Sequence, residues 1–306
     1  MVRVFVPASV GNVGPGFDTL GMAITGPGDT VEAEWSTTPG VTIDYIDGDG
    51  SSSLPLDPDK NTAGIAAREV LLLARETRGV TLTIHKGVPG TGLGSSAASA
   101  VAGAFAVNSL LDHPFPKEDL LPACIEGESY VSGGVFLDNL GASLFGGVVT
   151  CHTNMEKVWK VGTIDSLQVI VATPDVPVLT RNARRLLDRV PMSGFVHNMA
   201  SACAMVAAVA REDAISFGSA IDDQVIEPQR SRLIKGFDQV KSAAIGAGAL
   251  GCSISGAGAS VFAVAERPEQ AELIGHAMAT AFAGSNMSCT VTLAEMDGEG
   301  ARILGS

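Results

Sequence analysis

A glycine-rich segment followed by four small residues is the part of this sequence best suited to chemistry. Residues 88–98 run Val-Pro-Gly-Thr-Gly-Leu-Gly-Ser-Ser-Ala-Ala. Glycines permit positive φ angles and let a ligand approach the main chain closely. If a helix begins at Ser95, its first-turn N–H groups and its dipole favour an anion, and the hydroxyls of Ser95 and Ser96 can bind phosphate or Mg²⁺. The segment therefore predicts a phosphate site.

This segment has three alternative interpretations. It could be no more than a tight connection between a strand and a helix. No Lys follows the last glycine, so it is not a Walker-type P-loop. Gly90, Gly92 and Gly94 give G-x-G-x-G without an acidic residue at the expected strand end, which disfavours an NAD-dependent oxidoreductase. The double serine followed by two alanines is more specific than the glycines and favours nucleotide phosphates.

The elements around this segment would hold it at one end of a sheet. Val80–His85 alternates like a strand, and an apolar helix is expected from about Ser95 to Leu111. Asn61 has the character of an N-cap for a helix over 62–77. Glycine-rich and polar loops are expected over 7–21 and 47–59. Further strands are predicted at 2–6, 30–35, 167–172, 253–265 (a pair) and 289–295, and further helices at 117–129, 198–211, 237–249 and 268–283.

Composition narrows the class of protein. The chain has 306 residues, of which 46% are hydrophobic and 17% charged, as expected for a globular protein of two domains. A net charge of −13 argues against nucleic acid as a partner, although backbone N–H groups can still hold a nucleotide. Five scattered cysteines without a CxxC predict reduced, buried thiols in a cytoplasmic protein. No stretch is a convincing membrane span or signal peptide, and the nearest, Ser95–Leu111, is predicted to be a buried helix.

Together with two further motifs, the phosphate segment resembles the signature of the GHMP kinases, which include galactokinase and homoserine, mevalonate and phosphomevalonate kinases. Their phosphate loop has the form Pro-x-x-Gly-Leu-Gly-Ser-Ser-Ala-Ala; here the stretch between Pro89 and Gly92 is one residue shorter than in many homoserine kinases. Residues 7–18, Pro-Ala-Ser-Val-Gly-Asn-Val-Gly-Pro-Gly-Phe-Asp, look like the homoserine-kinase form of the first motif. Residues 255–260, Ser-Gly-Ala-Gly-Ala-Ser, look like the third. The three motifs stand in the family's order across most of the chain.

The resemblance implies an ATP-dependent enzyme that converts L-homoserine to O-phospho-L-homoserine in threonine biosynthesis. It places Mg²⁺ on Ser95 and Glu128, and Asn61 near adenine. Asp18, Asp138 and Asn139 would join Ser95 and Glu128 at the reacting centre. Asp18 and Asp138 are the nearest candidates for a base. The ATP-binding residues would be Asn61, Val88, Pro89, Gly90, Thr91, Gly92, Leu93, Gly94, Ser95, Ser96, Ala97 and Ala98.

The resemblance also implies an amino-acid site. Asn12 and Asp18 would hold the amino and hydroxyl ends of homoserine, although Asn and Asp also favour loops for turn reasons alone. A carboxylate favours arginine, and the family places Thr180, Arg184 and Arg230 there. Surface arginines that are merely solvated are the alternative, and Arg232 is expected to be one. The remaining predicted substrate residue is Gly256.

One departure from the family keeps a rival substrate open. Related homoserine kinases have a histidine two residues before the Asp-Asn pair, and this chain has Phe136. The substitution leaves phosphoryl transfer intact and opens the possibility of a different small alcohol. A nucleotide-binding relative without catalysis is the other rival, but it would have no need of an amino-acid clamp.

The fold implied by the resemblance is α+β with two domains. Residues 1–158 would form a ribosomal-protein-S5-like domain that binds ATP, and residues 159–306 a ferredoxin-like domain. The active site would lie in the cleft between them. A homodimer is the usual assembly in the family.

Overall fold

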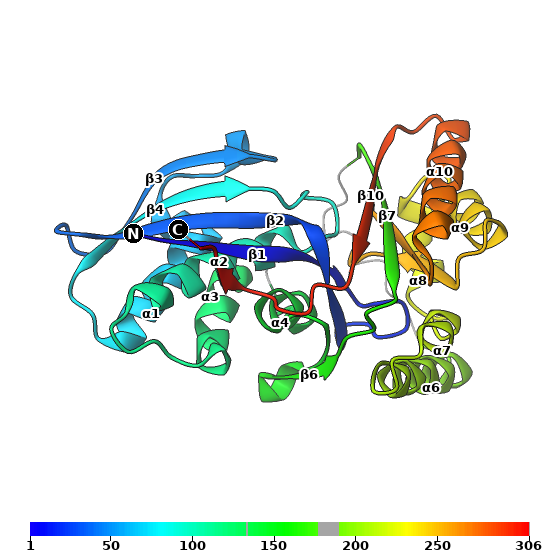
Figure 1. The fold of residues 1–306 in the computed structure, drawn as a ribbon, viewed down its shortest axis with the longest axis horizontal. Coiled ribbons are helices and arrows are strands. Elements are labelled where there is room, and N and C mark those ends of the chain that lie inside the picture. Colours follow the sequence, from blue (N-terminus) through cyan, green and yellow to red (C-terminus); the bar gives the residue numbers. More distant parts are fainter. Residues whose placement is uncertain (133, 177–189, 306) are drawn as a thin grey trace.

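The computed structural model describes residues 1–132, 134–176 and 190–305, which form two sheets with helices packed on them (Figure 1). The first sheet has seven strands and the second has four. Strands and helices are mixed along the chain, and the second sheet is wholly antiparallel. The α+β class expected from the sequence is confirmed.

The first sheet carries the N-terminal half. Its strand order is β11-β1-β2-β4-β3, with β5 pairing β2 and β6 pairing β5. The strands predicted at 2–6 and 30–35 are real but longer, so the glycine-rich loop expected over 7–21 is confined to residues 12–19. The strands are β1 (Val2–Gly11), β2 (Leu20–Ser36), β3 (Val41–Gly48), β4 (Gly79–Lys86), β5 (Val148–His152), β6 (Lys157–Gly162) and β11 (Arg302–Ile303).

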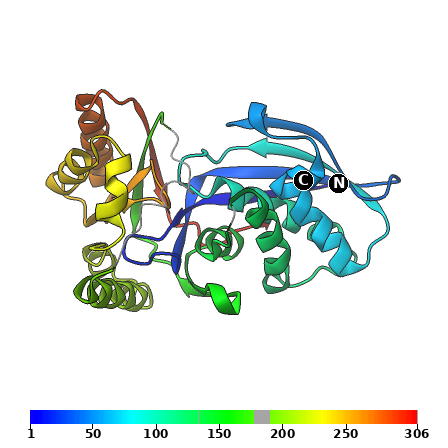
Figure 2. The ribbon, with the colours of Figure 1, turned by 180° about the vertical axis from the view of Figure 1, so that it is seen from behind.

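Four helices cover one face of this sheet (Figures 1 and 2). The central one, α2, is buried along most of its length because its side chains are small. Gly103 lets α1 come close, since a Cβ at that position would stand 2.1 Å from Ala63 O. The helices are α1 (Thr62–Ala74), α2 (Ser95–Leu110), α3 (Leu121–Ser132) and α4 (Leu137–Phe145), with short 3₁₀ turns η1 (Ser51–Ser53), η2 (Pro58–Lys60), η3 (Lys117–Leu120) and η4 (Thr153–Met155).

The second sheet has a hydrophobic core on each of its two faces. Val169, Val171 and Phe262 face the large core shared with the first half, whereas Ile170 and Ala263 face a second core under α9 and α10. This alternation follows from the two-residue period of a strand. The sheet order is β10-β7-β9-β8, formed by β7 (Gln168–Pro174), β8 (Gly251–Ile254), β9 (Val261–Ala265) and β10 (Cys289–Glu295). The described helices of this part of the chain are α6 (Met192–Val209), α7 (Ala214–Ser219), α8 (Glu227–Arg230), α9 (Phe237–Gly246) and α10 (Pro268–Gly284), with η5 (Ser231–Leu233).

Helix α6 differs from the others in what it exposes. Among the described helices, it alone has the length and apolar composition of a membrane span, and only 22% of it is buried. Asn198, Met205 and Val209 pack inward, while Met192, Phe195, Val196 and Met199 are exposed. Core helices of globular proteins share this composition, so composition alone does not place α6 in a bilayer.

The end of the chain returns to its beginning. After β10 the chain runs back to the first sheet, where β11 pairs antiparallel with β1 through Val4–Ile303 and Phe5–Arg302. The two termini therefore lie side by side in both views (Figures 1 and 2). The domain boundary expected at residue 158 stays a prediction; strand β6 runs across it.

Candidate active site

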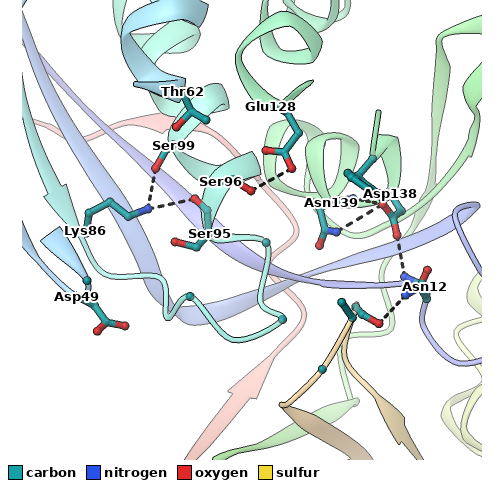
Figure 3. Close-up of a pocket in the computed structure, with 18 of the residues that line it drawn as sticks. Asn12, Asp49, Thr62, Lys86, Ser95, Ser96, Ser99, Glu128, Asp138 and Asn139 are labelled. Atoms are coloured by element: carbon teal, nitrogen blue, oxygen red, sulfur yellow. Dashed lines mark hydrogen bonds between the residues drawn. The ribbon is translucent and has the colours of Figure 1, made fainter. Parts of the chain in front are cut away.

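A pocket between the two sheets is lined by residues from most of the predicted site segments (Figure 3). Asp49 lies at one end and Asn12 and Asp138 at the other, with the first turn of α2 between them. The lining residues are Asn12, Asp18, Asp49, Gly50, Ser53, Leu54, Thr62, Lys86, Gly90, Gly92, Gly94, Ser95, Ser96, Ser99, Glu128, Phe136, Asp138, Asn139, Arg230, Gly256, Ala257 and Gly258.

The predicted phosphate loop has the geometry that anion binding needs. Gly92 and Gly94 have φ angles of +93° and +70°, which residues other than glycine rarely adopt. Helix α2 begins at Ser95 without a side-chain cap, so no side chain of the described residues caps its first-turn N–H groups. Five loop residues line the pocket, whereas Val88, Leu93, Ala97 and Ala98 are buried in the core and support the loop from behind.

The three motifs that the sequence placed far apart contact one another here. In the first motif, the N–H of Ser9 donates to Leu93 O at 3.0 Å. In the third, the N–H of Ser260 donates to Thr91 O at 3.1 Å, and Ser255 Oγ donates to Gly92 O at 2.7 Å. The phosphate loop is thus held from both sides, and its shape depends on both halves of the chain.

A hydrogen-bonded cluster lies at the Asn12 end of the pocket. The main-chain N–H of Asn12 donates to Asp138 Oδ2 at 2.9 Å, and Asn12 Nδ2 donates to Gly256 O at 2.8 Å. The N–H of Asp18 donates to Asn12 Oδ1 at 3.0 Å. Ser9 Oγ donates to Asn139 Oδ1 at 3.0 Å. Asn12, Asp18, Asp138, Asn139 and Gly256 therefore come together, as the sequence predicted.

Asp138 is the carboxyl group whose ionisation this cluster changes most. Burial, and after it the charge of Asp18, raise its pKa to about 6, while N–H donors from Asn12 and Asn139 oppose the rise. Because this pKa is higher in the folded chain than its ordinary value of 3.8, ionising Asp138 costs folding stability as the pH rises toward and past 6. At neutral pH the group is largely a carboxylate that can accept a proton.

The predicted Mg²⁺ pair is rearranged in the structure. Buried Glu128 accepts a hydrogen bond at Oε1 from Ser96 Oγ at 3.0 Å. The hydroxyl of Ser95, which was predicted to act with Glu128, instead donates to Val88 O at 2.9 Å. Neighbouring residues of a helix project about 100° apart, so only one of two adjacent serines can point at a given partner. Both serines line the pocket.

One of the three predicted carboxylate-binding residues falls within the described part of the chain. Arg230 is 3% exposed, its Nη1 donates to Gly256 O at 3.0 Å, and its guanidinium lies 5.0 Å from the Phe17 ring. Arg230 and Asn12 thus share one carbonyl acceptor. Thr180 and Arg184 lie outside the described residues.

Some lining residues were not predicted, and seven of the predicted ATP-binding residues do not line the pocket: Asn61, Val88, Pro89, Thr91, Leu93, Ala97 and Ala98. Asn61 caps α1, accepting from Ala63 N at 3.0 Å, and its amide donates to Pro55 O at 3.0 Å. Sequence reasoning missed Lys86 and the 49–54 segment. The one available signal for Lys86 was a lone lysine just before the phosphate loop; the 49–54 segment reads as an ordinary polar loop.

Two chemical features of the described residues bear on metals and thiols. They contain no group of three or more His, Cys, Asp or Glu side chains that could hold a metal ion. A cation here would therefore share its coordination with a ligand's oxygens, which is the habit of Mg²⁺.

All five cysteines are free thiols, and Cys203 is exposed rather than buried.

Comparison with known proteins shows the family of the chain. The family model for the GHMP kinases N terminal domain matches residues 61–147, and the model for the GHMP kinases C terminal domain matches residues 205–284. A homoserine kinase from Chloroherpeton thalassium is 38% identical, with 99% of each chain covered. A homoserine kinase from Halorubrum lacusprofundi is also 38% identical, with 94% of each covered.

Solved structures of related kinases have the same fold as this chain. A crystal structure of homoserine kinase from Cytophaga hutchinsonii superposes with a TM-score of 0.94 at 38% identity, covering 99% of this chain and 97% of the other. The mevalonate kinase of L. major, at 14% identity, gives 0.73 with coverages of 97% and 96%. The second likeness concerns the fold alone, and both confirm the predicted fold.

Proposed function

The chain belongs to the homoserine kinase family of the GHMP kinases, and on that premise we propose that it transfers the γ-phosphoryl group of ATP to the side-chain hydroxyl of L-homoserine. One observation carries the proposal: three motifs separated by most of the chain meet at a single pocket. At 38% identity over nearly the full length, the resemblance reaches beyond those motifs.

The nucleotide would lie along the loop. Asp49 marks the end available to the nucleoside, and the first-turn N–H groups of α2 would hold the phosphates. Glu128 and Ser96 would hold Mg²⁺, because a carboxylate and a hydroxyl beside a phosphate site form a donor set that suits this cation. When bound, Mg²⁺ supplies charge neutralisation at the phosphate oxygens. Ser95 would then fix the loop through Val88 instead of binding the metal.

The alcohol would occupy the Asn12 end. Arg230, with Thr180 and Arg184, would bind the α-carboxylate, while Asn12 and Asp18 hold the amino and hydroxyl ends. Phosphoryl transfer depends mainly on positioning, and the hydrogen bonds around Asn12 supply a preorganised frame for it. Asp138 and Asn139 would stand nearest the reacting hydroxyl.

A substrate panel tests the proposal directly. ADP release from MgATP is measured with homoserine, threonine, serine, mevalonate and galactose. We expect homoserine to have the highest kcat/KM. If another alcohol is preferred by more than about tenfold, roughly 1.4 kcal/mol, homoserine is the wrong substrate and the Phe136 substitution becomes the first explanation to test.

The pKa of Asp138 predicts a pH dependence. If its carboxylate accepts the proton of the attacking hydroxyl, kcat/KM for homoserine should fall below about pH 6, where the group becomes protonated. Asp138→Asn should lower kcat and abolish this acid limb. A variant that loses activity yet keeps the limb would make Asp138 a positioning residue and assign the titration to another group.

We propose a homodimer with α6 as its contact surface. The exposed face with Phe195 and Met199 is apolar, and the helix has no Asp, Glu, Lys or Arg in its 18 residues. Two chains of net charge −13 repel each other, so an uncharged surface offers the least repulsion. Light scattering should show a dimer for the wild type and a monomer for Phe195→Glu/Met199→Glu. Leu72→Glu, on the exposed face of α1, is the control and should stay dimeric.

A further inference from the structure

An ion pair lies buried at the base of the phosphate loop. Lys86 ends β4, immediately before the loop, and Asp29 lies on the neighbouring strand β2. Their side chains are 4% and 0% exposed, and Lys86 Nζ contacts Asp29 Oδ2. None of the motifs that identified the family includes either residue.

Every acceptor position of the Asp29 carboxylate is used. Its Oδ1 accepts from the main-chain N–H groups of Gly87 and Val88, at 3.0 and 3.1 Å. Its Oδ2 accepts from Lys86 and from Ser99 Oγ, the latter at 2.9 Å. An ionised carboxylate has about four such positions. Asp29 therefore fixes the two residues with which the loop begins.

The Lys86 ammonium is equally committed, and it reaches the other end of the loop. Beyond Asp29, it donates to Ser95 O at 3.1 Å and to Ser99 Oγ at 2.7 Å (Figure 3). Both serines lie in the first turns of α2, where the loop ends. An ammonium has three N–H donors, and these three acceptors use them all. Although Lys86 lines the pocket, its donors are directed at the protein.

We propose that the Asp29–Lys86 pair is a positioning element that sets the opening of the phosphate loop, by tying the strand where the loop begins to the helix turn where it ends. The inference rests on the proposed function, since it assumes that the loop binds nucleotide phosphates. A buried ion pair is a poor source of stability, because desolvation offsets much of its attraction. Its value here lies in fixing the separation of Gly87 from Ser95, and with it the direction of the first-turn N–H groups.

The test separates phosphate binding from nucleoside binding. In the double variant Asp29→Asn/Lys86→Met, the amide carbonyl introduced on β2 can still accept from Gly87 and Val88, no charge is left buried, and the tether to Ser95 is lost. Calorimetry should show Kd for MgADP raised at least tenfold and Kd for adenosine changed less than twofold. Ser99→Ala, which keeps the ion pair, should weaken MgADP two- to fivefold. The matched control removes the partly exposed Arg3–Glu32 pair on β1 and β2, as Arg3→Met/Glu32→Gln, and should change neither Kd.

Each result bears on one of the two proposals. An unchanged Kd for MgADP in a double variant that melts near the wild type would overturn the positioning role. Equal losses for MgADP and adenosine would also overturn it, because a general structural effect acts on the whole pocket. If the double variant fails to fold, Ser99→Ala decides by the same comparison. Wild-type protein that binds no MgADP would instead refute the proposed function.

Discussion

Replacing Glu128 with glutamine is expected to lower kcat by about a hundredfold while leaving the fold intact. The amide keeps the size of the side chain and can still accept the hydrogen bond from Ser96 Oγ. It removes the negative charge that would hold Mg²⁺ beside the phosphates, and the loss of one such electrostatic contact costs on the order of 10²–10³ in rate. Steady-state kinetics across a Mg²⁺ titration should show half-maximal activity moved to higher Mg²⁺.

The same helix supplies the control. Glu126 lies on α3 just before Glu128 and is exposed, so Glu126→Gln removes an equal charge without touching the pocket. It should retain the wild-type kcat and Mg²⁺ dependence. If Glu128→Gln behaves like Glu126→Gln, Glu128 does not bind the metal, and its bond to Ser96 is structural only.

Replacing Arg230 with alanine should raise KM for homoserine ten- to a hundredfold and leave KM for ATP nearly unchanged. A lost charged hydrogen bond to a carboxylate is worth about 1.5–3 kcal/mol, which corresponds to that range. Arg230→Lys should restore only part of the affinity, because a single ammonium lacks the planar fork that matches a carboxylate. Initial rates measured with each substrate varied in turn will separate the two KM values.

Two comparisons sharpen this test. Arg232→Ala removes an exposed arginine two residues away and should alter neither KM. Homoserine lactone has no free carboxylate, so it should bind the wild type poorly and be little affected by Arg230→Ala. A rise in KM for ATP instead would place Arg230 at the nucleotide and remove the main physical support for an amino-acid substrate.

Local sequence pattern predicted those elements whose signals are local. The helix after the phosphate loop begins at Ser95 and ends at Leu110, within one residue of expectation, because a glycine turn marks its start. Asn61 is the predicted N-cap. By contrast, the strand over 41–48 was missed. It pairs parallel with β4, and its polar residues interrupt the apolar pattern that would identify a strand. Likewise, residues 7–11 and 20–29 contain the glycines and prolines of a loop, yet sheet pairing holds most of them extended.

The site was predictable in membership and less so in geometry. Motif resemblance named Asn12, Asp138 and Glu128, all of which line the pocket. It could not say which of two adjacent serines faces Glu128, since that depends on the rotation of α2 against α3. Nor could it find Lys86, whose partners Asp29 and Ser99 lie 57 positions before it and 13 after it. Such contacts arise only from the tertiary fold.

The return of the chain to the first sheet imposes an order on folding. Strand β1 is an edge strand until residues 302–303 pair with it, so during synthesis its outer backbone groups stay open until those residues have left the ribosome. Closing a contact between positions 4 and 303 costs more loop-closure entropy than almost any other contact in this chain, because the intervening loop is so long. The contact also brings residues near the two termini together. A circular permutant, in which the termini are joined and the chain is opened in a surface loop, should therefore keep the same sheet order.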